Sequence, residues 1–184
     1  MSSIRIRLNN ETRALPLPAE EKTLLEVLRG AGYSLPAACG GRGRCGKWGR
    51  CWSCPPACGT LEQAASRIAR FDRGILVQST AKLADDFDYD GIQALSRTHA
   101  RRFAALARQM RLLCTRTLPL SAGPCLVCRR CTCPDRPCRY PSRRISAMEA
   151  YGLLVSDVCV RSGLAYNYGP GTMTYTSCIL YSEE

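Results

Sequence analysis

The chain of 184 residues has a single histidine, little lysine and no long run of apolar residues. His99 lies on the apolar side of a predicted helix, where a hydrogen-bonded core or interface histidine is a better interpretation than a metal ligand or proton-transfer group. With that histidine so interpreted, we predict neither a Ser-His-Asp nor a Cys-His catalytic pair. The apolar stretches are far shorter than the about 20 residues that a membrane-spanning helix needs.

The N-terminal segment alternates apolar and basic residues, as a strand does, and lacks the apolar core and cleavage site of a signal peptide. We therefore expect no membrane span and a cytoplasmic location.

The charge is one-sided, with a formal net charge of +11. Lysine occurs at Lys22, Lys47 and Lys82, so nearly all of the cations are arginines. Such an excess can serve nucleic-acid binding or docking of an acidic partner protein. The arginines are dispersed along the chain, without a stripe of interleaved aromatic residues. We therefore expect an acidic redox partner protein and no nucleic acid, and the oligomeric state stays open.

Cysteine, in contrast, is abundant, with thirteen residues in the chain. Ten of them form two clusters, Cys39, Cys45, Cys51, Cys54 and Cys58 in the first and Cys125, Cys128, Cys131, Cys133 and Cys138 in the second. Thiolates so close in Gly- and Pro-rich turns can converge on one soft metal centre and are a poor basis for a long-range disulfide framework. In a reducing compartment, clustered cysteines indicate metal or redox chemistry. The isolated Cys114, Cys159 and Cys178 are interpreted as small hydrophobic residues.

The pattern between the loops predicts strands mixed with helices. Capping boxes begin predicted helices at Thr23, Thr60 and Ser146, ending near Arg29, before Gly74 and near Ser162 respectively. A longer helix is predicted from Asp88 or Asp90 to about Cys114, with the acidic run around Asp85 serving as a solvated turn and N-cap. Strands are predicted at 3–8, 12–17, 75–80 and 172–181. Because strands and helices do not strictly alternate, the fold class expected is α+β.

The second cysteine loop carries the clearest metal pattern. Cys125, Cys128 and Cys131 form C-x2-C-x2-C, a spacing that wraps a turn around three corners of an iron–sulfur cube. Cys138, followed closely by Pro141, is the predicted fourth ligand, because Cys133 is too close to Cys131 to bind comfortably beside it. A Cys₄ zinc site would use the same thiolates but usually has two C-x2-C knuckles. The spacing therefore favours a [4Fe–4S] cluster over zinc.

The first loop combines two resemblances. Pro36-Ala-Ala-Cys39-Gly-Gly-Arg-Gly-Arg-Cys45-Gly-Lys resembles the cluster loop of a [2Fe–2S] ferredoxin, and the strands and helix before it resemble that family's β-grasp opening. The family pattern has its third cysteine where this chain has Trp48, and tryptophan cannot bind iron. The resemblance covers about residues 1–47 and implies a partial ferredoxin-like segment at 1–44.

From residue 45 onward the chain resembles another family. The run Cys45-Gly-Lys-Trp-Gly-Arg-Cys-Trp-Ser-Cys54-Pro-Pro-Ala-Cys58-Gly, with Gly123-Pro-Cys125 and Cys138-Arg-Tyr-Pro141, resembles an uncharacterised family of predicted metal-binding proteins, a domain of unknown function. The resemblance covers nearly all of 45–184 and names no reaction. It implies Cys45, Cys54 and Cys58 as ligands in the first loop, with Cys39 or Cys51 as the fourth.

These observations predict a small α+β protein with two cysteine-rich metal loops at 45–184, preceded by the partial β-grasp-like strand–strand–helix segment. The function expected is iron–sulfur binding with electron transfer to a partner enzyme, the chain being a carrier or accessory protein more than an enzyme. A [4Fe–4S] cluster is expected in the second loop, and a second cluster, [2Fe–2S] or [4Fe–4S], is a hypothesis for the first. A structural zinc-binding interaction module is the alternative, and an enzyme with a substrate-binding cluster is a third interpretation.

Overall fold

The computed structural model describes residues 3–8, 11–16, 47–85 and 88–183, and the chain divides into two units, 1–48 and 49–184. In the first unit, β1 (Ser3–Leu8) and β2 (Glu11–Pro16) pair antiparallel, within a residue of the predicted strands. The helix predicted from Thr23 lies outside the described residues. So does the predicted boundary between residues 44 and 45, which stays a prediction.

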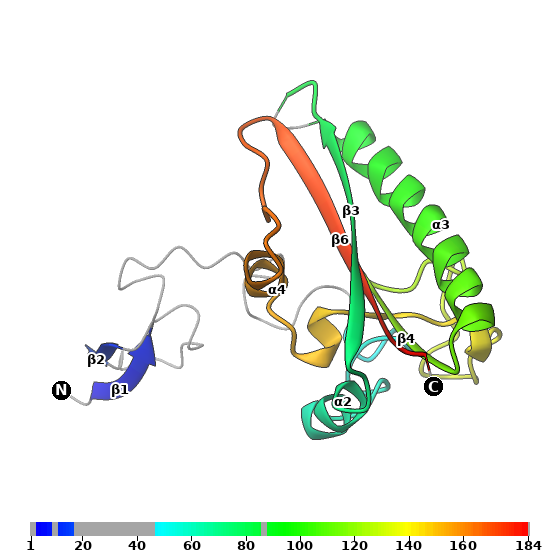
Figure 1. The fold of residues 1–184 in the computed structure, drawn as a ribbon, viewed down its shortest axis with the longest axis horizontal. Helices are drawn as coiled ribbons and strands as arrows, with labels where there is room; N and C mark the ends of the chain where they lie inside the picture. The colour runs from blue at the N-terminus through cyan, green and yellow to red at the C-terminus, as the bar shows by residue number, and fades with distance from the viewer. Residues whose placement is uncertain (1–2, 9–10, 17–46, 86–87, 184) are drawn as a thin grey trace. The chain divides into compact units, whose positions relative to one another are not determined.

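The second unit is built on a four-stranded mixed sheet with the order β3-β6-β4-β5 (Figure 1). Its strands are β3 (Arg73–Lys82), β4 (Arg116–Ser121), β5 (Ser146–Ala147) and β6 (Thr172–Ser182). β6 pairs antiparallel with both β3 and β4, whereas β5 pairs parallel with β4. This mixture of a largely antiparallel sheet with separate helices confirms the predicted α+β class.

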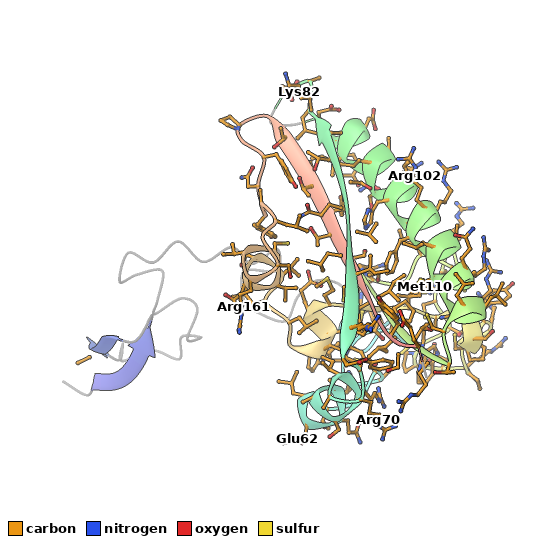
Figure 2. The ribbon with its side chains drawn as sticks, in the orientation of Figure 1. Glu62, Arg70, Lys82, Arg102, Met110 and Arg161 are labelled. Atoms are coloured by element: carbon orange, nitrogen blue, oxygen red, sulfur yellow. The ribbon has the colours of Figure 1, made fainter. Side chains whose placement is uncertain are left out.

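The long helix α3 (Tyr89–Leu113) covers one face of the sheet. Asp88 caps it, its carboxylate accepting a hydrogen bond from the Gly91 N–H at 2.8 Å, as the sequence predicts. Phe103, Ala107 and Met110 pack against Ile179 of β6 in one core cluster. Figure 2 shows Met110 on the sheet side of α3 and Arg102 on the outer side.

The opposite face of the sheet packs against shorter elements. These are α2 (Leu61–Ile68), the 3₁₀ turn η2 (Glu149–Tyr151) and α4 (Val155–Arg161). The core there contains Ala64, Leu120, Met148, Tyr151 and Cys178. Ile179 and Cys178 belong to core clusters on opposite faces of the sheet, because neighbouring side chains of a strand point to opposite faces.

The predicted capping box at Thr60 is confirmed, with both reciprocal hydrogen bonds to Gln63 present. The predicted helix starting at Ser146 is wrong. Ser146 and Ala147 instead form β5, paired with Leu120 and Ser121, and the Met148 N–H continues the contact by donating to the Ser121 carbonyl at 3.0 Å. Strand pairing and the complete burial of Met148 outweigh the local capping pattern, and α4 starts only at Val155.

Like β5, strand β4 was not predicted. Pro119 lies in the middle of β4, and a proline usually argues against a strand because it cannot donate to the ladder. Among the described residues, β5 pairs only with Leu120 and Ser121, so residues 116–119 of β4 have no strand partner on that side. Across the described residues, no helix is long and apolar enough to cross a membrane.

Candidate metal centre

The described part of the first cysteine loop is a series of turns before α2. The Cys54 N–H donates to the Cys51 carbonyl at 3.0 Å, and the Cys58 N–H donates to the Cys54 carbonyl at 3.1 Å. All three of these cysteines are buried. The other two predicted ligands of this loop, Cys39 and Cys45, lie outside the described residues.

The second cysteine loop holds its predicted ligands nearer to the surface. Cys125, Cys128, Cys131 and Cys138 are half-buried, and Cys133 is buried. A turn separates Cys131 from Cys138, closed by a hydrogen bond from the Arg136 N–H to the Thr132 carbonyl at 3.0 Å. The Thr132 hydroxyl also donates to the Pro137 carbonyl at 2.8 Å. No disulfide joins the cysteines of the described residues.

The two cysteine loops lie against each other, which the sequence did not predict. The Cys125 N–H donates to the Ser53 hydroxyl at 3.1 Å, and the Trp52 indole N–H donates to the Arg136 carbonyl at 3.0 Å. The Cys51 side chain also lies close enough to Cys131 to lower the pKa of its thiol. The two predicted metal loops therefore form one composite, cysteine-rich region.

Ser53 is the residue at this junction that sequence reasoning missed. It is fully buried, and its hydroxyl lies 3.0 Å from the Cys51 sulfur and 3.8 Å from the Cys54 sulfur. The same oxygen accepts the bond from Cys125. A lone serine between cysteines gives no signal in the sequence, because its importance depends on a partner far along the chain.

The pKa values of the thiols differ across the region. Burial raises the pKa of Cys125, and it also raises that of Cys58 and Cys133. For Cys131 burial opposes the net shift, but backbone N–H groups of Cys133 and Trp52, with the Cys51 side chain, outweigh it and lower the pKa. The junction between the loops thus favours a thiolate at Cys131.

The thiol side chains are suitable ligands for a soft metal, but those in the described residues do not form a closed metal site. Thiolates suit zinc and iron–sulfur clusters. Among the residues that the structure describes, no three Cys, His, Asp or Glu side chains gather closely enough to hold a metal ion. The structure brings Cys51 close to Cys131, and both Cys51 and Cys128 lie near enough to Cys125 to raise the pKa of its thiol.

Arginines surround the second loop. Arg129, Arg130 and Arg139 line a hollow of about 720 Å³ together with Cys128. The Arg139 guanidinium donates to the Arg130 carbonyl at 3.1 Å, which fixes one wall. Arg144 is exposed nearby in the sequence. The surface beside the predicted cluster ligands is therefore strongly basic.

The single histidine lies in the core, whereas the two tryptophans are more accessible to solvent. His99 is 3% exposed, and its two ring nitrogens lie 2.8 Å from the Ser79 and Ser177 hydroxyls, which confirms a satisfied core histidine. Its pKa is lowered by burial. Trp48 is 58% exposed and so does not pack in the core. Trp52 is half-buried at the junction of the loops.

The isolated cysteines fit their predicted role in packing. Cys159 and Cys178 are buried, and Cys114 is half-buried against the α3 cluster. Burial raises the pKa of the Cys178 thiol to about 12. These residues therefore behave as small hydrophobic side chains.

Comparison with known proteins gives one result. The family described as "Predicted metal-binding protein (DUF2284)" matches residues 34–181. The match starts before the predicted residue 45 and includes Cys39, and nothing supports a ferredoxin-like segment ahead of it. No curated protein and no solved structure matches the chain. Because the match covers most of its length, the chain belongs to the DUF2284 family of predicted metal-binding proteins.

Proposed function

We propose that this protein is an iron–sulfur protein that carries electrons to a partner enzyme, with a [4Fe–4S] cluster on Cys125, Cys128, Cys131 and Cys138. The observation that carries the proposal is the C-x2-C-x2-C series in one half-buried loop whose thiols are all free. Membership of a family of predicted metal-binding proteins supports the metal. The bound cluster would supply one-electron chemistry, and the chain would supply its ligands and its surroundings.

The residues around the second loop have separate tasks in this proposal. The bond between the Cys125 N–H and Ser53 anchors the start of the loop to the buried first loop. The turn at Thr132–Pro137 shortens the path between Cys131 and Cys138. Because a metal bound by the folded loop would not be bound in the same way by the unfolded chain, binding should stabilise the fold.

The basic surface suits an acidic partner. Arg129, Arg130 and Arg139 lie with Cys128 around one hollow, so a partner docked there would approach the proposed cluster. Attraction between such surfaces speeds association and is screened by salt. Electron transfer to the partner should therefore slow as the ionic strength increases.

A second cluster is proposed in the first loop, on Cys45, Cys54 and Cys58. The family pattern leaves Cys39 or Cys51 as its fourth ligand. Cys51 lies near Cys131 and so against the second loop. The choice between Cys39 and Cys51 stays open.

A structural zinc site is the second candidate function, and one observation favours it. The pairs Cys51–Cys54 and Cys128–Cys131 are C-x2-C knuckles, and the contact between Cys51 and Cys131 joins them. Two such knuckles from separate loops are typical of a Cys₄ zinc site. Zinc there would fix the two loops against each other without redox activity.

Single substitutions separate the two candidates. The protein and its C138S, C51S and C114S variants would be purified without oxygen and analysed for iron, zinc and acid-labile sulfide. The iron–sulfur proposal expects C138S to lose iron and sulfide relative to the control C114S, whose thiol lies outside both loops. The zinc proposal expects a different result. The unsubstituted protein and C138S would contain zinc, whereas C51S would lose it, and this result would establish a zinc site shared by the two loops.

A further inference from the structure

A second hollow lies between α3 and the start of the second cysteine loop. It has a volume of about 630 Å³, which is within the range of small-molecule sites. One wall comes from Ala94–Ala104 of α3, and another comes from Ser121–Val127. Nothing in the proposed electron-transfer role uses this cavity.

The charges around this cavity all have one sign. Arg97, Arg101 and Arg143 line it, and no aspartate or glutamate does. Within the described residues, none of these arginines forms an ion pair, and Arg143 lies over the ring of Tyr140 at 5.4 Å. Unpaired guanidinium groups at a concave surface attract and orient an anion, and they match a carboxylate well.

The rest of the lining is largely apolar. Phe103 and Ala104 contribute from α3, while Leu126, Val127 and Ile145 contribute from the opposite side. A fully hydrated inorganic anion would gain little from these side chains. A ligand with an apolar body beside its charge would bury that body against them.

The polar part of the cavity lining is held together by hydrogen bonds. His99 and Ser177 line it, and their side chains are held 2.8 Å apart. The Ser177 hydroxyl also accepts a hydrogen bond from the Ala122 N–H at 2.8 Å, which ties β6 to the segment leading into the cysteine loop. Ser79 holds the other nitrogen of His99. These hydrogen bonds fix the positions of the His99 and Ser177 side chains in the cavity lining.

We propose that the cavity binds a small organic carboxylate with an apolar body, its charge at the arginines and its body against the apolar wall. Cys125 also lines the cavity, so the bound acid would lie beside a ligand of the proposed cluster. Binding of the acid does not depend on the proposed function, and only its position next to a metal centre does.

The test is calorimetric titration of the full-length protein with hexanoate, hexan-1-ol and inorganic phosphate at physiological salt. We expect saturable binding of hexanoate and much weaker binding of hexanol and phosphate. R97Q and R143Q should each weaken hexanoate binding roughly tenfold, the effect of losing one charge-assisted contact. R102Q is the matched control, because Arg102 lies on the outer side of the same helix (Figure 2).

Four results would overturn the proposal. They are the absence of saturable hexanoate binding by folded protein, equal binding of hexanol, equal binding of phosphate, and an equal loss in R102Q and R97Q. A104L is a second, helix-compatible variant that narrows the cavity, and it should abolish hexanoate binding while the circular dichroism spectrum is unchanged. Iron and zinc would be measured in the same samples, because the expected binding holds whichever metal is present.

Discussion

Replacing Ser53 with alanine removes one oxygen from the junction of the two cysteine loops. That oxygen is fully buried, accepts the hydrogen bond from the Cys125 N–H at 3.1 Å, and lies 3.0 Å from the Cys51 sulfur. Alanine keeps the shape of the side chain, so the loss is chiefly that of the hydrogen bond. Losing the bond and leaving its N–H unpaired costs about 1–3 kcal/mol. Because Cys125 is only half-buried, water can reach part of the junction, and we expect about 1–2 kcal/mol.

The assay is urea unfolding of the full-length protein under one fixed metal condition, followed by far-ultraviolet circular dichroism. A loss of this size should also lower the melting temperature by about 3–8 °C for a domain of this length. The control is S66A, because Ser66 is exposed on α2 and its replacement should change the free energy of unfolding by less than about 0.5 kcal/mol. Equal stabilities of S53A and S66A would refute the role of Ser53 in holding the loops together.

Three further predictions concern the core. L120A should lower the free energy of unfolding by about 2–5 kcal/mol because Leu120 is completely buried, and a loss no larger than that of L112A, on an exposed site, would contradict this. Burial lowers the pKa of His99, so the unfolded state takes up the proton first; stability should fall as the pH drops below about 6.5, and the H99Q variant should lose that part of the slope. Burial raises the pKa of Cys178 to about 12, so iodoacetamide at neutral pH should label it only after unfolding, as peptide mass analysis would reveal.

Local patterns were enough to predict several elements. Asp88 and Thr60 start their helices as predicted, because a cap depends on residues within one turn. The helix expected at Ser146 failed for the opposite reason, since pairing with Leu120 and Ser121 decides its conformation. Strand β4 could not be predicted from the sequence because it contains Pro119. The proline is accommodated because β5 does not pair with that part of the strand, and this pairing depends on the tertiary structure.

The candidate site was likewise predictable only where it depends on local sequence. The spacing of Cys125, Cys128 and Cys131 is local and indicates a metal loop from the sequence alone. The contacts that join this loop to the first connect residues 72 and 84 positions apart, at Ser53 and Trp52. The spacing of cysteines within one loop cannot predict contacts between residues so far apart in the sequence. The sequence therefore indicated two metal loops, and the structure adds that they share a junction.

The most direct test of the central claim is analysis of iron, zinc and acid-labile sulfide in protein purified without oxygen. The account predicts a brown protein that contains iron and sulfide in equal amounts and gives an electron paramagnetic resonance signal on reduction. A colourless protein with stoichiometric zinc and no sulfide would contradict the electron-transfer proposal.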